Sequence, residues 1–276
     1  MTHISESHRQ GVAPGTDIRS RLAEELVSFL SPASLEADQY RTLRQLVERL
    51  RRESAFQVLA VTSATPGDGK TITTLNLAGS LVQSPNTRVL VIDADLHRPA
   101  VAGYLGLGDA RTHGLAETIL HDDYSLGRAV RHLEPLNLSV LLSGDGHMAP
   151  YELLASPRLE GLLAEARRRY DYVLIDTPPV VPLADCRLLG RWVDGFIVVV
   201  AAHKTPRKLL VEALKLLDPE KVVGVVFNGD DRPLSPYYGY YGYSDSERTP
   251  SRSPARPSSW WRRAPNRHKQ TTQSHR

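Results

Sequence analysis

A glycine-rich turn that ends in Gly-Lys-Thr is the clearest chemical signal in this sequence of 276 residues. It lies in VLAVTSATPGDGKTITTLNLA (58–78), where an apolar run is followed by the Gly/Pro-rich turn and then by a helical pattern. Such a turn aims backbone N–H groups at phosphate, and the N-terminus of the next helix adds partial positive charge. The predicted phosphate-binding residues are Pro66, Gly67, Asp68, Gly69, Lys70, Thr71 and Ile72.

Two of these side chains have specific expected roles. Lys70 would reach the β- and γ-phosphates of a nucleoside triphosphate, and the Thr71 hydroxyl would bind Mg²⁺. The strict phosphate-loop pattern has glycine where this chain has Ala64, but the order of strand, loop and helix is kept.

Three aspartates follow apolar runs and are candidates for metal chemistry. VLVIDAD ends in Asp93 and Asp95, and YVLIDTPP contains Asp176. Open α/β sheets bind ligands beyond the carboxyl ends of their strands. Two carboxylates at i and i+2 could share Mg²⁺ coordination and the positioning of an attacking hydroxyl, although Asp-x-Asp after a strand is often only a helix cap. Asp176 has the place of a Walker B carboxylate that binds Mg²⁺ through water.

These residues need a scaffold, and the apolar pattern predicts one. Strands are expected at 56–62, 88–95, 138–143, 171–179, 194–202 and 221–229. The helices between them are expected to begin near Lys70, Pro99, Gly114, Pro157, Leu183 and Pro206. Continuous apolar strands separated by helices predict an α/β fold of the P-loop NTPase type, with a mainly parallel central sheet and helices on both faces. Two earlier helices are predicted, a short amphipathic one over 18–30 and a second over 35–52.

Four regions are expected along the chain: a leader with the amphipathic helix (1–34), the P-loop domain (35–230), a tyrosine cluster (231–243) and a disordered basic tail (244–276). The net charge is only +3, but lysine and arginine are concentrated in the tail. The tail could contact nucleic acid or anionic lipid, or it could simply be solvated.

The compartment is predicted from what the sequence lacks. A lone cysteine excludes an internal disulfide and a multi-cysteine metal site. No apolar run approaches the roughly 20 residues that span a bilayer, and no secretory signal is visible at the N-terminus. We expect a cytoplasmic protein.

Together the motifs resemble those of the bacterial tyrosine kinases, the CpsD/CapB-like autokinases of capsule and exopolysaccharide synthesis. The match rests on TSATPGDGKT, VLVIDADLHRP, YDYVLIDTPP and the terminal tyrosine cluster, and it covers roughly 35–243. The resemblance implies ATP and Mg²⁺ as cofactors, with Lys70 and Thr71 as binding groups. It also implies metal contacts from Asp95 and Asp176, a base at Asp93 and an adenine contact at Asn228. For Asn228, a purely structural role at the strand end is the alternative.

The resemblance identifies the phosphate acceptors as Tyr237, Tyr238, Tyr240, Tyr241 and Tyr243. Phenols separated by glycine beside an ordered domain could reach the active site of a neighbouring copy, so autophosphorylation in trans is expected. Each phosphate would add about −1.5 to −2 charge, which could reverse the attraction between subunits. A sticky aromatic linker or a packed terminal segment is the alternative.

Residues 37–44 and His97 differ in part from the pattern of the same family. ADQYRTLR (37–44) resembles its Glu-x-x-Arg-x-x-Arg oligomerisation helix, with Asp38, Arg41 and Arg44 in the three places. These charges could pair with a neighbouring subunit, or they could form an exposed ion pair within the helix. His97 stands where the family usually has arginine, which lowers the positive charge beside the phosphates unless Arg98 compensates.

The resemblance also implies partners. A membrane adaptor of the chain-length (Wzz-like) type, supplied as a separate chain, would hold this protein at the inner face of the plasma membrane, and the amphipathic helix over 18–30 is a possible docking element. Self-association and an opposing phosphotyrosine phosphatase are expected; a nucleic-acid partner is not.

Three other functions are weighed against the kinase. They are a MinD/ParA-like ATPase switch, which has lysine where this chain has Thr65, an ATP-binding scaffold for polysaccharide assembly, and a metabolic nucleotide or sugar kinase. The clustered tyrosines favour the tyrosine kinase, because none of the three needs them.

Overall fold

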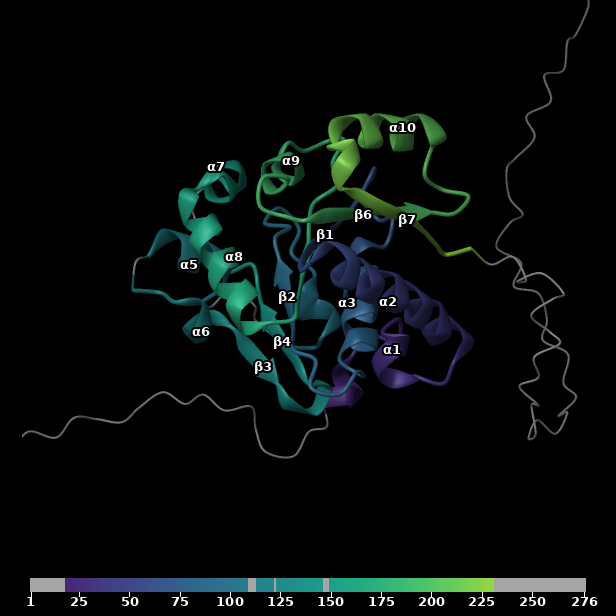
Figure 1. Ribbon diagram of the computed structural model, residues 1–276, viewed down its shortest axis with the longest axis horizontal. Helices are drawn as coiled ribbons and strands as arrows, with labels where there is room; N and C mark the ends of the chain where they lie inside the picture. The colour runs from purple at the N-terminus through teal and green to yellow at the C-terminus, as the bar shows by residue number, and fades with distance from the viewer. Residues whose placement is uncertain (1–17, 109–112, 122, 146–148, 231–276) are drawn as a thin grey trace, which may run out of the picture. The chain divides into compact units, whose positions relative to one another are not determined.

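Seven strands form one sheet in the computed structural model, which describes residues 18–108, 113–121, 123–145 and 149–230 (Figure 1). Every neighbouring pair of strands is parallel except β3 and β4. In spatial order the strands are β3 (Arg131–Leu133), β4 (Leu138–Leu141), β2 (Val89–Asp93), β5 (Tyr172–Asp176), β1 (Val58–Ser63), β6 (Gly195–Ala201) and β7 (Val222–Asn228).

Helices cover both faces of this sheet, as the sequence predicts (Figure 1). One face packs against α1 (Val27–Leu30), α2 (Leu35–Ser54), α3 (Lys70–Leu81) and α4 (Val101–Tyr104). The other packs against α5 (Leu115–Leu120), α6 (Leu126–Ala129), α7 (Pro150–Ala155), α8 (Pro157–Arg169), α9 (Asp185–Leu189) and α10 (Arg207–Leu216). Short 3₁₀ turns occur at Ile18–Arg21, Glu134–Leu136 and Pro219–Lys221. Over the described ranges, no helix is both long and apolar enough to span a bilayer.

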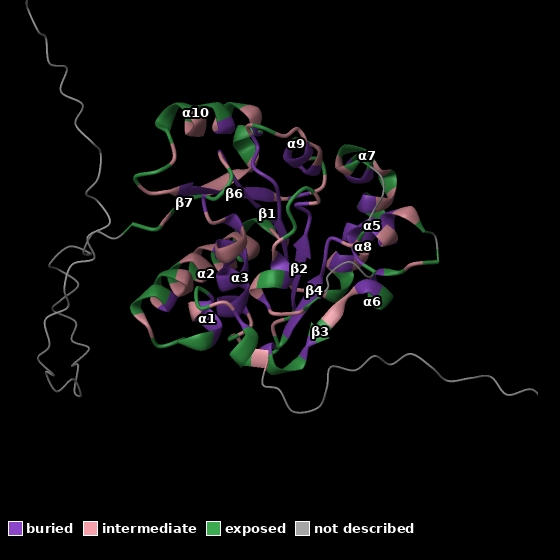
Figure 2. Ribbon diagram, turned by 180° about the vertical axis from the view of Figure 1, so that it is seen from behind, coloured by how far each residue is buried: buried purple, intermediate pink, exposed green. Residues whose placement is uncertain are grey.

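The strands read as continuous apolar runs because both of their faces are covered. Every residue of β1, β2, β4 and β5 is buried, and the burial weakens at β3 and β7, the two edge strands of the sheet (Figure 2). All six predicted strands are present. The sequence missed β3, which has three residues and is too short for a detectable period.

The N-terminal helix predicted over 18–30 is wrong in extent. Only a 3₁₀ turn and the four-residue α1 form there, because the backbone between them is bonded elsewhere. The N–H of Ala23 donates to the carbonyl of Tyr104 (2.9 Å), and the side-chain amide of Asn76 donates to the carbonyl of Glu25 (2.8 Å). These contacts compete with the helical hydrogen-bond pattern.

The apolar stripe of this segment packs against its own domain. Leu26 is fully buried and Phe29 is 8% exposed. A Cβ added to Gly79 of α3 would lie 2.8 Å from the Phe29 ring, so glycine makes room for that ring. The stripe is therefore part of the core here and does not present the docking surface that its pattern suggested.

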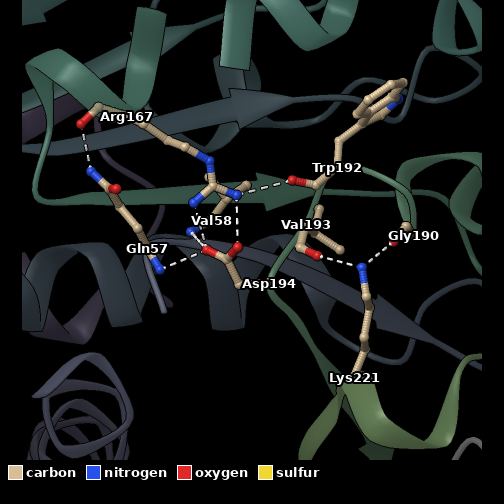
Figure 3. A network of polar contacts seen from close by, with 8 residues as sticks. All are labelled: Gln57, Val58, Arg167, Gly190, Trp192, Val193, Asp194 and Lys221. Carbon is tan, nitrogen blue, oxygen red and sulfur yellow. Dashed lines mark hydrogen bonds and ion pairs between the residues drawn. The ribbon is translucent and has the colours of Figure 1, made fainter. Parts of the chain in front are cut away.

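A polar network ties together the amino ends of β1 and β6 (Figure 3). The Asp194 carboxylate accepts hydrogen bonds from the backbone N–H groups of Gln57 (2.8 Å) and Val58 (2.7 Å) and from both terminal nitrogens of Arg167 (2.8 and 2.7 Å). Lys221 donates to two carbonyls of the loop that precedes β6 (2.7 and 3.0 Å). The network lies at the amino ends of the strands, whereas Asp93 and Asp176 lie at the carboxyl ends of β2 and β5. Its role is therefore structural.

The Phe29→Ala substitution should lower the free energy of unfolding by about 3 kcal/mol, because it removes a buried aromatic side chain and leaves a cavity. Leu30→Ala, at a neighbouring side chain that is 36% exposed, should change it by less than about 0.5 kcal/mol. Urea denaturation measures both values. Equal effects of the two substitutions would show that the stripe is not part of the core.

Asp194→Asn should destabilise the protein by about 2 kcal/mol at pH 7, because hydrogen bonds to a charged group are lost. Burial raises the pKa of Asp194, but the bonds from Arg167 and the backbone outweigh it and lower this pKa below its ordinary value. Between the folded and unfolded pKa values the unfolded state binds more protons, so the stabilisation is present above about pH 4 and is lost as the pH falls further.

Thermal unfolding from pH 8 to pH 3 checks this dependence, with Glu212→Gln on the exposed side of α10 as the control. A gap between wild type and Asp194→Asn that widens as the pH falls would contradict the assignment.

Candidate active site

The topology of the sheet brings the predicted carboxylates to the phosphate-binding loop. β5 lies between β2 and β1, and Asp93 pairs in register with Asp176, which also pairs with Val61 of β1. All three strands are parallel, so their carboxyl ends meet at one edge. The expected convergence of one loop and the strand-end aspartates is present.

The phosphate-binding loop, residues 64–69, depends on two glycines with left-handed backbone conformations, Gly67 (φ 79°) and Gly69 (φ 96°). Other residues rarely adopt such angles. A Cβ on Gly69 would also overlap the side-chain amide of Asn228. Gly69 precedes α3 without any side-chain cap, so the first N–H groups of α3 keep their capacity to bind an anion.

A cavity of about 490 Å³ opens beside this loop. That volume is in the range of small-molecule sites. The cavity is lined by Pro66, Gly67, Gly69, Lys70, Thr71, Ile72, Asp95, His97, Arg98, Ala100, Tyr104, Pro179, Pro182 and Leu183. Most of the predicted nucleotide-binding residues therefore share one cavity, while Asp68, Asp93, Asp176 and Asn228 do not line it.

Asp176 is fully buried at the end of β5. Its Oδ2 accepts a hydrogen bond from the Thr71 hydroxyl (2.6 Å), and its buried Oδ1 has no partner. Burial raises the pKa of Asp176 to about 7, with a further rise from Asp95, while Thr71 and Lys70 oppose it. An unpaired carboxylate oxygen next to a threonine hydroxyl fits a divalent cation held directly or through water.

No ready-made metal cage accompanies this pair. Among the residues that the structure describes, no three carboxylate, imidazole or thiol side chains cluster as a metal site. Mg²⁺ usually keeps several waters and binds through one or two carboxylates together with substrate phosphates. The donor set of Thr71, Asp95 and Asp176 suits that mode of binding.

Asp93, the predicted base, is bonded to the backbone of the next helix. Its Oδ2 accepts hydrogen bonds from the N–H groups of Ala100 and Val101 (3.1 Å each), so it holds the first turn of α4. Burial, followed by the charge of Asp176, raises the pKa of Asp93 well above its ordinary value. The side chain is 1% exposed and does not line the cavity. These contacts position the start of α4, and the role of Asp93 as a base stays a prediction.

The segment after β2 contributes the opposite wall of the cavity. Asp95 accepts a hydrogen bond from the N–H of Arg98 (3.0 Å). The Nε2 of His97 lies 2.6 Å from Oδ2 of Asp185, a buried carboxylate at the start of α9. Sequence reasoning missed Asp185, because the pair is 88 positions apart and no local pattern links the two residues.

Asp68 and Asn228 support the loop from behind. The Asp68 carboxylate is fully buried and accepts hydrogen bonds from Thr65 and Thr205. The side-chain amide of Asn228 donates to the Asp68 carbonyl (3.1 Å). The adenine contact of Asn228 stays a prediction, and Thr205 is a second residue that sequence reasoning missed.

The predicted oligomerisation charges are bonded within the chain. Arg41 forms an ion pair and a hydrogen bond with Asp38 one turn away, and it also donates to the carbonyl of Pro32. Arg44 donates to the carbonyl of Ser80 (2.8 Å) at the end of α3 and lies 3.5 Å from the carboxylate of Glu48. The local ion pair is therefore present, and a role in self-association stays a prediction.

Comparison with known proteins decides the family. A family model described as an AAA domain matches residues 56–205. The tyrosine-protein kinase YwqD of Bacillus subtilis (strain 168) is 35% identical over 229 residues, which cover 82% of this chain and 95% of that protein. The chain belongs to the bacterial tyrosine-protein kinase family.

Other similar proteins differ from this chain in length. The succinoglycan biosynthesis transport protein ExoP of Rhizobium meliloti (strain 1021) is 31% identical over 206 residues, which cover 73% of this chain but only 26% of ExoP. The solved kinase domain of the Escherichia coli tyrosine kinase ETK superposes with a TM-score of 0.71 at 27% identity and covers 80% of this chain and 84% of that one. The P-loop α/β fold is thereby confirmed, and the fold implies nucleotide binding with a divalent metal.

The five predicted acceptor tyrosines and the basic tail of this kinase-family chain lie outside the described residues.

Asp176→Asn should stabilise the nucleotide-free protein at pH 8 and abolish its stabilisation by Mg²⁺-ADP. The pKa of Asp176 is raised on folding, so the folded state binds the extra proton between about pH 4 and pH 7 and the free energy of unfolding falls as the pH rises across that interval. Asparagine does not ionise, so the free energy of unfolding no longer falls for this reason as the pH rises. Its side-chain oxygen can still accept the hydrogen bond from the Thr71 hydroxyl. We expect an increase of at least about 1 kcal/mol, or roughly 3 °C.

Melting temperatures at pH 5 and pH 8, with and without Mg²⁺-ADP, provide the measurement. The increase in melting temperature that Asp176→Asn causes without ligand should be smaller at pH 5 than at pH 8. A variant that melts below wild type at pH 8 without ligand would overturn the account of Asp176.

Proposed function

We propose that this chain is an ATP- and Mg²⁺-dependent protein-tyrosine kinase that phosphorylates the C-terminal tyrosine cluster of a neighbouring copy. One observation carries the proposal: Lys70, Thr71 and Asp95 line a single cavity, and Thr71 bonds Asp176 directly behind its wall. Membership of the bacterial tyrosine-kinase family supplies the reaction class, and the repeated phenols of 237–243 supply the acceptor.

The triphosphate would lie along the loop and the N-terminus of α3. Lys70, which is 7% exposed, would contact the β- and γ-phosphates. Thr71, Asp95 and Asp176 would hold Mg²⁺, which when bound neutralises charge on the phosphate oxygens. If the Thr71 hydroxyl turned to Mg²⁺, Asp176 would lose the hydrogen bond that Thr71 now donates. The bound cation would then compensate the charge of this buried carboxylate.

Positioning would supply most of the rate enhancement. The transition state of phosphoryl transfer is loose in most analyses, and catalysis then depends on alignment and on charge stabilisation. The loop and the carboxylates beside it would align the phosphates and the metal, so transfer would depend little on a general base. The buried position of Asp93 is therefore compatible with transfer, because Asp93 orders the segment that carries Asp95.

We place this activity in the control of capsule or exopolysaccharide synthesis and export. The similar protein ExoP supports this context, since its name describes succinoglycan biosynthesis and transport. A Wzz-like adaptor supplied as a separate chain would recruit the kinase to the inner face of the plasma membrane. A phosphotyrosine phosphatase would reverse the modification, and self-association would bring one copy's tyrosines to another copy's cavity.

Incubation of the full chain with Mg²⁺-ATP, with and without an adaptor, followed by phosphosite mapping, tests the proposal. Phosphate should appear on Tyr237, Tyr238, Tyr240, Tyr241 or Tyr243. Lys70→Met should lower incorporation at least about 100-fold, because it removes the cation that contacts the transferring phosphate. Tyr151→Phe, at a side chain that is 51% exposed, should leave incorporation unchanged.

A mixing experiment tests whether phosphate is transferred between copies. The Lys70→Met chain, mixed with a chain whose five clustered tyrosines are phenylalanine, should become phosphorylated. Tight Mg²⁺-ADP binding with no phosphate on the cluster would favour an ATP-binding scaffold or switch instead.

A further inference from the structure

Asp68 is a buried charge that the proposed chemistry does not use. It belongs to the phosphate-binding loop, but it is fully buried and does not line the cavity. A negative charge close to bound phosphate is unfavourable by Coulomb's law. Asp68 therefore needs another role, and its hydrogen bonds show one.

The Asp68 carboxylate is held by donors from two segments. Within the loop, Thr65 donates its backbone N–H to Oδ2 (3.0 Å) and its hydroxyl to Oδ1 (2.8 Å). From the connection between β6 and α10, the Thr205 hydroxyl donates to Oδ1 (2.9 Å). The Thr205 oxygen in turn accepts the N–H of Ala201 (2.9 Å), so the only proton of this hydroxyl is directed at Asp68.

The backbone of the same loop is held from the same side of the sheet. Asn228, the last residue of β7, donates its side-chain amide to the Asp68 carbonyl (3.1 Å), and Lys204 donates to the carbonyl of Gly67 (3.2 Å). The carbonyl of Asn228 accepts the N–H of Ala202 (2.8 Å), which ties the end of β7 to the connection after β6.

We propose that Thr205 and Asn228 are positioning residues for nucleotide binding, which act together through Asp68. We call this set of three residues the Asp68 clamp. The clamp holds the peptide groups between Gly67 and Gly69 so that the N–H groups of the loop stay aimed at phosphate. The inference rests on the proposed function only in taking a nucleoside di- or triphosphate as the ligand.

The loop needs such a device because its sequence is flexible. Two glycines in left-handed conformations give a backbone with many alternative states, and ordering it during binding would cost affinity. The clamp supplies this order in advance. Thr205 does not line the cavity, and its hydroxyl contacts the phosphate-binding loop at Asp68. Its effect on the nucleotide is therefore indirect.

The clamp and simple electrostatics predict opposite effects at Asp68. If charge repulsion dominated, Asp68→Asn would tighten nucleotide binding. If the clamp dominates, the substitution weakens binding, because one of the two carboxylate acceptors becomes an amide donor that faces other donors.

Calorimetric titration of Mg²⁺-ADP into the full chain gives the test. Thr205→Val keeps the shape of the side chain and removes the donor, so the Kd should rise about tenfold, the range for loss of a hydrogen bond to a charged group. Thr205→Ser keeps the hydroxyl and should stay within about threefold of wild type. Asp68→Asn should weaken binding by at least about tenfold.

A matched control separates positioning from general destabilisation. Thr118→Val removes another buried threonine hydroxyl, which donates to the carbonyl of Gly114 (2.7 Å) in α5 and does not line the cavity. It should lower the melting temperature about as much as Thr205→Val and leave the Kd within about twofold of wild type.

An unchanged Kd for Thr205→Val would overturn the clamp, as would equal losses for the valine and serine variants or tighter binding by Asp68→Asn. Failure of the kinase proposal gives a different result, namely wild-type chain that binds Mg²⁺-ADP but transfers no phosphate to tyrosine. The clamp is measured by binding alone, so the two failures are distinguishable.

Discussion

The site depends on two carboxylates that the sheet forces together and removes from water. Asp93 and Asp176 are in register on adjacent parallel strands, and both are buried. Neighbouring strands lie about 4.8 Å apart, so the charges repel each other where solvent screening is weak. Each has one oxygen without a hydrogen-bond partner, and the pKa of each is raised by burial. The neighbouring loop, with Lys70 and the N-terminus of α3, supplies the nearest positive potential.

This arrangement gives the nucleotide-free protein a stability cost at the place where function requires charge. Groups that remain unsatisfied in a folded protein are often functional, because stability is supplied elsewhere in the structure. Here that stability comes from fully buried central strands, from helices on both faces and from the Asp194 network at the opposite edge of the sheet. A rigid scaffold at one edge thus supports a strained arrangement of charges at the other.

The loop itself is organised by contacts from outside its own motif. Gly67 and Gly69 allow the turn, but Thr205, in the connection after β6, and Asn228, at the end of β7, hold it. Asp93 similarly holds α4, so that the segment with Asp95, His97 and Arg98 closes the cavity. In both cases a buried aspartate of a nucleotide-binding motif contacts protein backbone or hydroxyl groups rather than the cavity.

The sequence by itself determined the described strands other than β3, the mainly parallel sheet, the phosphate-binding loop and the aspartates at the strand ends. These features are local: apolar runs of strand length, a Gly-Lys-Thr turn before a helix and acidic residues directly after strands each leave a pattern in a few consecutive positions. Only the tertiary structure decided that the segment 18–30 breaks into short turns, that Asp93 points under α4, and that Asp185 and Thr205 belong to the site. Those outcomes depend on hydrogen bonds between residues far apart in the chain, and a single sequence carries no periodic or positional signal for such pairs.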